Sequence, residues 1–587
     1  MKGFPPMSMT AQDGLSTALI HEGWNHLQSQ RPLAAWGSWQ RALRADPSSV
    51  AAQQALAALE SASDLPLAAR TAYRFREAGD SARRAAWDDR MRGQSDHDLV
   101  ATADLFGRLA TADPGDSAAW YNRALSLAWM GKNLEAIGCL DRVAGLEAEG
   151  AFDQAVDAWA LAEVLRQGAG AEPLADDLRF ACTMAWKPGN TSRLLDEFPE
   201  IQRIPTPRAP GATAEHTPEI EVFEWLDRPV ASRADHPGAV GSPPTVLASV
   251  YISGQTLRLS SPRAENLERV EESLFPRLEI GAASVRREAS PLPIPFLDAD
   301  VWVFRIPPGL DPDLADQLSR ESIEQYFENH WIHRPRHGLD DRSPLGAALE
   351  ASRGDAVARA KLTAVVRLRE QLGNRPSALL LYQGYPFDRL RRRLGLELVY
   401  PNAVELQDLS CASGEELDRL DPATLDDSRL VEAFTSAAGL RDDARTGRLA
   451  SELLKRRPAA LASLDLTALV SPLVRLAMGR DDYKAALSWL KQARSMSAGE
   501  TATTLEVWRA EVFARAGRPE SAMVVYERLI TPDAAGAALA LDAGETMLDS
   551  GFFDQAKVLL LAAAETGRRI RQSWIERRAG QVLDRIP

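Results

Sequence analysis

The sequence predicts a mainly α-helical protein in which two arrays of helical repeats, one at each end, flank a central α+β domain. Three observations support this prediction. A 34-residue pattern of small and bulky residues occurs near both ends of the chain. A proline-rich stretch follows the first array, and the apolar pattern then changes from the period of a helix to that of a strand. We therefore expect helical repeats in residues 1–200, a linker in 201–217, the central domain in 218–405 and further repeats in 406–587.

The first array is predicted from two units of paired helices. In the first unit, Gly23 and Ala35 are small where two helices must touch, and Trp39 is bulky where the core must be filled. A second unit begins at Ser117 and carries the same kinds of residue in the same places: Ala124, Ala136 and Leu140. A single helix pair cannot bury both of its faces, so neighbouring pairs are expected to stack.

The second array keeps the same period. Ala510 and Gly544 are separated by 34 residues, and so are Ala522 and Ala556. All four are small residues at positions where the two helices of a pair approach each other. Agreement at several positions in consecutive units indicates stacked helix pairs, although a generic alanine-rich helical array is the alternative.

These two segments resemble the tetratricopeptide family, whose repeat is a helix pair of about 34 residues. The resemblance implies a groove lined by the first helix of each pair, which binds extended peptides or helices. In the first array, the residues expected to face the groove are apolar or aromatic: Ile20, Trp24, Trp87, Tyr121 and Leu125. In the second array they are acidic: Glu511, Glu545 and Asp549. The other interpretation of the first set is that neighbouring repeats or the central domain cover it.

Chaperone-binding members of the family hold the terminal carboxylate of a peptide with a lysine and an asparagine. This chain has Ile20 and Trp24, and then Tyr121 and Leu125, at those places. Binding of a chaperone tail is therefore not expected.

The central domain is predicted from alternating apolar residues. Ala248, Val250 and Ile252 share one face of a strand, and a Ser-Gly turn at 253–254 leads to a second strand, which predicts a hairpin. A strand is expected before the hairpin at 220–225 and another at 301–306. Helices are expected at about 264–275, 312–330 and 355–372.

Parts of this domain resemble an uncharacterised bacterial module found beside SEC-C-type metal-binding tails. The segment 330–362 also resembles the toxin-binding region of Xre/MbcA/ParS-type antitoxins, through Trp331, Pro335, Leu339 and Pro344. This resemblance implies a surface that binds a protein partner. Ser343 is suited to cap the helix that Pro344 begins. The chain shows no helix-turn-helix and no cysteine-rich tail, so toxin neutralisation itself is not expected.

The charge balance disfavours nucleic acid as a partner. The chain has a formal net charge of −14, which repels phosphate backbones and anionic lipid. Its longest basic run, residues 389–393, is expected to be a solvated helix face. No apolar stretch reaches the length of a membrane helix, and the first ten residues lack a secretory signal. With three dispersed cysteines, the composition favours a cytoplasmic protein.

Catalytic and metal-binding motifs were sought and not found. No glycine-rich phosphate loop, dinucleotide fingerprint, zinc-protease helix, EF-hand loop or serine-hydrolase elbow occurs. His330, His333 and His337 form the densest group of potential metal ligands, but Pro335 interrupts helical spacing between them, so surface histidines are expected. We expect no cofactor and no metal.

The function expected from these observations is that of a scaffold or adaptor that binds peptides or helices of partner proteins. The alternative is an enzyme or an antitoxin-like regulatory module in the central domain, to which the repeats present substrates. A deep polar pocket in residues 218–400 would favour the alternative.

Overall fold

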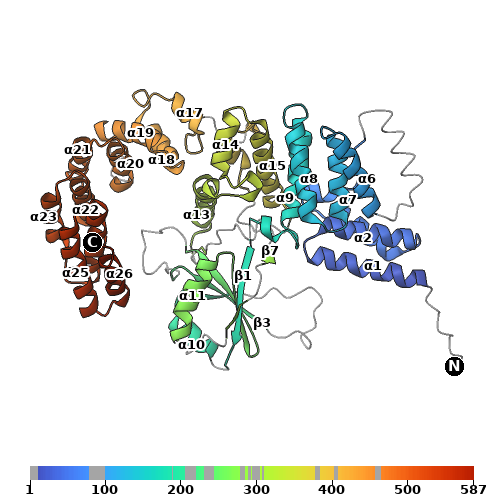
Figure 1. Ribbon diagram of the computed structural model, residues 1–587, viewed down its shortest axis with the longest axis horizontal. Coiled ribbons are helices and arrows are strands. Elements are labelled where there is room, and N and C mark those ends of the chain that lie inside the picture. Colours follow the sequence, from blue (N-terminus) through green and yellow to red (C-terminus); the bar gives the residue numbers. More distant parts are fainter. Residues whose placement is uncertain are drawn as a thin grey trace. The chain divides into compact units, whose positions relative to one another are not determined.

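The computed structural model describes residues 11–77, 99–176, 178–187, 190–204, 220–229, 244–277, 285–287, 292–293, 305–306, 310–376, 384–401, 407–456 and 464–586. The chain divides into two compact units, Met1–Val404 and Glu405–Pro587. Over these residues the protein is mainly helical and contains one small antiparallel sheet (Figure 1). None of the helices so described is long and apolar enough to cross a membrane.

The first unit begins with helices that pack mostly on their neighbours in sequence. They are α1 (Ala11–Gln28), α2 (Pro32–Ala45), α3 (Val50–Ser61), α4 (Leu67–Thr71), α6 (Leu99–Ala112), α7 (Ser117–Trp129), α8 (Asn133–Glu147) and α9 (Phe152–Arg166). Helices α1 with α2, and α7 with α8, form the two pairs that the 34-residue period predicts. In Figure 1, α6, α7, α8 and α9 lie side by side.

Glycine at a helix crossing explains how close the first pair lies. A Cβ atom added to Gly23 on α1 would lie 2.1 Å from Nε1 of Trp39 on α2, so only hydrogen fits there. Trp39 is fully buried, and its indole N–H donates to the carbonyl of Ile20 at 3.2 Å. The spacing of small and bulky residues thus identifies a real crossing point.

The sheet of the first unit is antiparallel throughout, in the order β2-β3-β4-β5-β1-β6, with β7 also paired to β1. The strands are β1 (Leu178–Ala185), β2 (Ile201–Ile204), β3 (Ile220–Leu226), β4 (Val246–Ser253), β5 (Thr256–Ser261), β6 (Val285–Arg287) and β7 (Leu292–Pro293). The predicted hairpin is present: Ser253 pairs with Thr256, and Gly254 has a φ of +56° in the turn.

One face of the sheet carries its hydrophobic core. Apolar side chains of β1, β3, β4 and β5 pack there against α10 (Asn190–Glu197) and α11 (Ala264–Arg277). Cys182, Val250 and Leu259 are each at most 1% exposed. Because Cys182 pairs with Leu259, and Leu259 pairs with Val250, the three lie in one row across the sheet.

The sheet begins earlier in the chain than we expected. Strand β1 lies within residues 1–200, where we expected helical repeats, and β2 occupies the first four residues of the expected linker. In β1 the buried residues Cys182 and Met184 alternate with Thr183, so the pattern is that of a strand. The short apolar run in this strand does not by itself distinguish a strand from a helix. Residues 205–217 of the linker and 301–304 of the expected last strand lie outside the described residues.

The remainder of the first unit is helical and packs on the first array. It comprises α13 (Pro312–Gln325), a π-helical turn (Tyr326–His330), two 3-10 turns (Trp331–His333 and His337–Leu339), α14 (Pro344–Ser352), α15 (Ala356–Gly373) and α16 (Phe387–Arg393). Helix α15 packs along α9. A 34-residue unit that follows the one beginning at Ser117 would begin at Ala151, directly before α9. In a continuous array, the second helix of that unit would come directly after α9 in the sequence. Here α15 packs on α9 in its place, and all strands of the sheet lie between α9 and α15 in the sequence.

The basic run at 389–393 is not a solvated face, and this prediction was wrong. Arg391, Arg392 and Arg393 are each at most 6% exposed. Arg391 pairs with Glu370 at 2.7 Å, and the neighbouring Arg389 donates to Glu328 at 2.8 Å. Buried arginine requires such partners, and acidic residues of α15 and the π-helical turn supply them.

The second unit consists of helices: α17 (Gly414–Arg419), α18 (Asp427–Gly439), α19 (Asp443–Arg456), α20 (Leu466–Met478), α21 (Tyr483–Arg494), α22 (Gly499–Arg515), α23 (Pro519–Leu529), α24 (Ala534–Asp549), α25 (Phe553–Arg569) and α26 (Ser573–Leu583). Each packs on the next in sequence. A Cβ on Gly544 of α24 would lie 2.6 Å from Leu560 of α25, which repeats the crossing of Gly23 and Trp39 in the first unit.

Candidate functional site

The residues expected to line a groove in the first array have different surroundings. Trp24 is 43% exposed and packs edge-on against Trp39, with ring centroids 5.0 Å apart. Ile20 is partly buried against the core, and Leu125 is fully buried. Trp87 lies outside the described residues. Among the described residues of this set, Trp24 is the exposed one.

The groove-facing side of α7 is covered by the chain itself. After α4, residues 72–77 run without helix or strand structure beside α7. Asn122 of α7 holds this segment by its backbone, because Oδ1 accepts from the N–H of Arg76 at 2.7 Å and Nδ2 donates to the carbonyl of Arg76 at 2.9 Å. A side-chain amide that bonds both polar groups of one residue recognises an extended chain independently of its sequence.

Aromatic side chains of the same segment fill the space around α7. Tyr73 stacks on Trp36 with ring centroids 4.9 Å apart. Phe75 packs between Phe106 and Trp129, at 5.1 and 5.0 Å. Residues 72–77 therefore behave as an extended ligand supplied by the protein itself.

Arg76 of this segment is held by a ring and a carboxylate. Its guanidinium lies 3.9 Å from the ring centroid of Tyr121 and donates to both carboxylate oxygens of Glu147, at 2.7 and 2.8 Å. Burial raises the pKa of Tyr121, and the Arg76 cation opposes that rise. Tyr121 thus contacts an extended segment, but one of the same chain.

The residues of the segment 330–362 that were expected to bind a partner are also mostly enclosed. Trp331 and Leu339 are 1% and 2% exposed and Pro344 is buried, whereas Pro335 is exposed. Ser343 caps α14 as expected, accepting from the N–H of Gly346 at 3.1 Å. Four residues of this segment were expected to contact a partner, but three of them form the interior of the first unit.

The same segment packs on α9 through buried polar contacts. Trp159 donates its indole N–H to the carbonyl of Gly338 at 2.8 Å. Glu163 is 1% exposed and pairs with Arg166 at 2.8 Å. Burial raises the pKa of Glu163, and Arg166 and Arg336 oppose that rise. This face of α9 is therefore also covered by the protein's own chain.

The three histidines do not converge on a metal site. His337 pairs through Nδ1 with Asp341 at 2.6 Å, and its backbone N–H donates to Asp176 at 2.5 Å. Within the ranges that the structure describes, no three His, Cys, Asp or Glu side chains are arranged to hold a metal ion.

The second unit contains an open pocket of about 520 Å³ between α20 and α22. Both are the first helices of their pairs, so the pocket lies on the face where the tetratricopeptide resemblance places a groove. Its walls come from the two helices and the residue after α20: Ser471, Val474, Arg475, Met478, Gly479, Trp508, Glu511, Val512 and Arg515. Glu511 was expected from the sequence to face this groove. Trp508 was not expected there, although it lies one helical turn before Glu511 and could have been found from that spacing.

The charged side chains that line the pocket differ in whether another side chain pairs with them. Arg475 is paired with Asp443 of α19 at 2.6 Å. Glu511 is partly buried, and no hydrogen bond to its carboxylate occurs among the described residues. Burial raises the pKa of Glu511; Arg515 opposes the rise and Asp542 adds to it. Glu511 is thus a carboxylate on a pocket wall without a hydrogen-bond donor.

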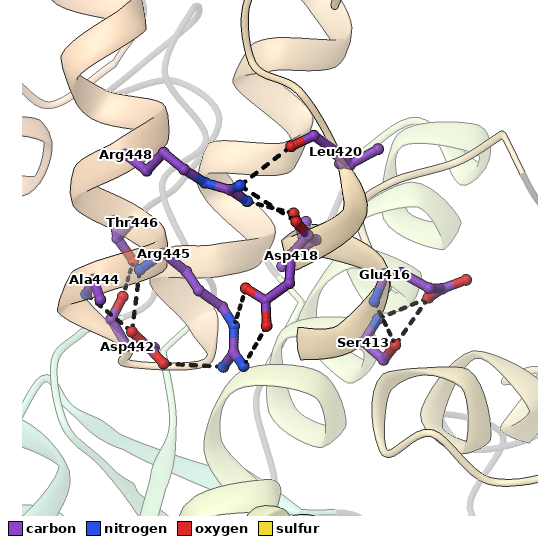
Figure 2. Close-up of polar contacts among 10 residues, drawn as sticks. Ser413, Glu416, Asp418, Leu420, Asp442, Ala444, Arg445, Thr446 and Arg448 are labelled. Carbon is purple, nitrogen blue, oxygen red and sulfur yellow. Dashed lines mark hydrogen bonds and ion pairs between the residues drawn. The ribbon is translucent and has the colours of Figure 1, made fainter. Parts of the chain in front are cut away.

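Two arginines at the start of the second unit are already held by other groups, as Figure 2 shows. Arg445 of α19 donates to both carboxylate oxygens of Asp418 in α17, each at 2.9 Å, and also to Asp442. Arg448 donates to backbone carbonyls at the end of α17, including that of Leu420. These contacts hold α17 on α19 and leave no anion site there.

Comparisons with known proteins identify no family for this chain. No family model matches it, and no curated protein matches it. Among solved structures, the crystal structure of yeast Tom70 aligns with 97% of this chain and 96% of its own, at 14% identity and a TM-score of 0.22. A TM-score this low supports no argument about fold or function.

Proposed function

We propose that the protein is an interaction scaffold whose stacked helix pairs are tetratricopeptide-like, and whose second unit binds an extended segment of a partner protein between α20 and α22. The observation that carries the proposal is the pocket on the first-helix face of that unit. Its apolar walls, Val474, Met478 and Trp508, can bury a partner's side chains. Its charged groups can orient them.

The first unit supports the proposal with an example from the same chain. There, residues 72–77 lie on the corresponding face of α7, held by Asn122 and by aromatic packing. Helix pairs of this protein therefore accept an extended chain on that face. Trp24, which is exposed among the described residues of the expected groove there, is proposed as a secondary contact for an apolar partner segment.

An enzyme in the central domain was the alternative, and it requires a deep polar pocket in residues 218–400. The pocket that carries the present proposal lies instead in the second unit. We propose protein or peptide partners, and no nucleic acid.

Selection of peptides by the full-length protein tests this function. A library of random twelve-residue peptides would be selected on the wild type and on Met478→Ala/Trp508→Ala. The control is Trp574→Ala, which removes a tryptophan that is 52% exposed on α26 and does not line the pocket. Thermal unfolding would establish that each variant is folded.

We expect the wild type and the control to enrich the same peptides, and the pocket variant to bind them at least about tenfold more weakly, since about 1.4 kcal/mol corresponds to tenfold. The proposal fails if the wild type enriches no peptides, or if the pocket variant binds them as tightly as the wild type.

A further inference from the structure

A basic side chain is bound in one groove of this protein by two groups. In the first unit, the guanidinium carbon of Arg76 lies 3.9 Å from the centroid of the Tyr121 ring, and one terminal nitrogen donates to both carboxylate oxygens of Glu147. Glu147 is 6% exposed. An aromatic ring and a carboxylate together offer the cation–π contact and the charge-assisted hydrogen bonds that suit arginine.

The wall of the second unit's pocket also carries an aromatic ring and a carboxylate. Trp508 provides an aromatic ring, and Glu511, three residues later on α22, lies one helical turn away on the same side of the helix. No described residue donates a hydrogen bond to the Glu511 carboxylate. A partly buried carboxylate without donors gains more from a cation than an exposed one does, because the water that would screen the pair is partly excluded.

The surrounding charges favour a cation over an anion. Arg475 on the pocket wall could bind an anion, but Asp443 neutralises its charge through hydrogen bonds of 2.6 and 2.7 Å. Arg515 is exposed and forms no ion pair within 4.0 Å among the described residues. Asp542 on α24 adds negative charge close enough to affect Glu511. The negative charges of Glu511, on the pocket wall, and of Asp542, close to Glu511, would therefore oppose binding of an acidic ligand.

We propose that the pocket between α20 and α22 binds an arginine side chain of the partner's extended segment, with the guanidinium on Trp508 and its N–H groups donating to Glu511. This inference rests on the proposed function, and it names the chemistry that the groove selects. The aliphatic part of the arginine packs on Met478 and Val474. Lysine binds less tightly, because an ammonium cannot stack on the ring and donate to the carboxylate with one planar group.

Five peptide libraries that differ at one position test the proposal. Each holds twelve residues, with a fixed central arginine, citrulline, lysine, methionine or glutamate and the other positions random. Citrulline has the shape of arginine without its charge. Affinities would be measured for the full-length wild type, for Glu511→Gln, and for Glu527→Gln, which removes one exposed charge on α23 away from the pocket.

We expect the arginine library to bind the wild type about tenfold more tightly than the citrulline library, the size of one charge-assisted hydrogen bond. Lysine should fall between them. Glu511→Gln should remove the preference for arginine over citrulline while leaving the methionine library unchanged, and Glu527→Gln should leave all five unchanged.

The inference is overturned if citrulline or methionine binds as tightly as arginine, or if glutamate is preferred, which would assign the pocket to an acidic ligand through Arg515. It is also overturned if Glu511→Gln keeps the arginine preference. In those cases the libraries still bind, so the proposed function stands. If none of the libraries binds, the proposed function fails with it.

Discussion

Asn122 of α7 holds Arg76 by both of its backbone polar groups, with hydrogen bonds of 2.7 and 2.9 Å. The two residues are 46 positions apart, and Asn122 is only 3% exposed. This pair decides whether the first unit's groove is filled, because it fixes the backbone of residues 72–77 while the aromatic side chains on either side fill the space.

Replacing Asn122 with leucine should release this segment. The substitution keeps the size of the side chain, removes both hydrogen bonds and leaves the Arg76 N–H and carbonyl without them. The expected cost is about 1–3 kcal/mol. Hydrogen exchange measured by mass spectrometry should show faster exchange at residues 72–77 while α8 stays protected. Gln53→Leu, at an exposed hydrogen bond to Pro47, is the control. Unchanged exchange in the Asn122 variant would show that aromatic packing alone holds the segment.

A methyl group at Gly338 should separate the segment 330–362 from α9. A Cβ there would lie 2.2 Å from Oε1 of Glu163, which is buried and tied to Arg166, so the neighbour cannot easily move. We expect Gly338→Ala to destabilise the first unit by about 1–3 kcal/mol, as overpacking does. Gly346→Ala on α14 is the control, since its nearest new contact is 3.4 Å. Equal stabilities of the two variants in urea unfolding would contradict this packing.

Two glycines of one helix should respond oppositely to alanine. Gly14 on α1 has no atom within 4 Å of an added Cβ, so Gly14→Ala should stabilise the helix by up to about 1 kcal/mol. Gly23→Ala should instead destabilise it by about 1–3 kcal/mol, because the new methyl group meets Trp39. Thermal unfolding of both variants checks the crossing of α1 and α2. A stabilising Gly23→Ala would show that the two helices are further apart.

Acid should loosen α17 from α19. Hydrogen bonds from Arg445 hold the pKa of Asp418 below its ordinary value of 3.8. A carboxylate with a lowered pKa contributes stability that is present above its unfolded pKa and is lost as pH falls through the folded one. The pair is mostly exposed, so its contribution is at most about 1 kcal/mol.

Asp418→Asn should therefore speed hydrogen exchange in α17 at pH 7, with the effect reduced in 1 M salt. The difference from the wild type should begin to shrink near pH 3.8 and vanish only once the pH has fallen through the lowered pKa of folded Asp418. Glu527→Gln again controls for loss of one charge. A difference that persists unchanged in acid would mean that Asp418 acts by its shape and not by its charge.

The sequence was most informative where residue size decides local geometry. The helix pairs were predictable because Gly23 and Gly544 occur where only a small residue lets two helices cross, and Trp39 and Leu560 occur opposite them. The cap at Ser343 and the turn at Gly254 were predictable because each depends on neighbours within a few residues.

The sequence was least informative where distant segments meet. Nothing near α9 shows that its partner is α15, about 200 residues later, because any amphipathic helix of suitable shape can pack there. The arginines at 389–393 looked solvated because their partners, Glu328 and Glu370, lie far away in sequence. The contact of Arg76 with the ring of Tyr121 was not expected for the same reason, because the two residues are distant in sequence.

Hydrogen exchange of the full-length protein with and without its best-binding selected peptide tests the central claim most directly, because it locates the bound segment. The account predicts that protection increases in α20 and α22, around Met478 and Trp508, and stays unchanged in the sheet and in residues 72–77. Protection confined to the central domain, or no protection in α20 and α22, would contradict the account.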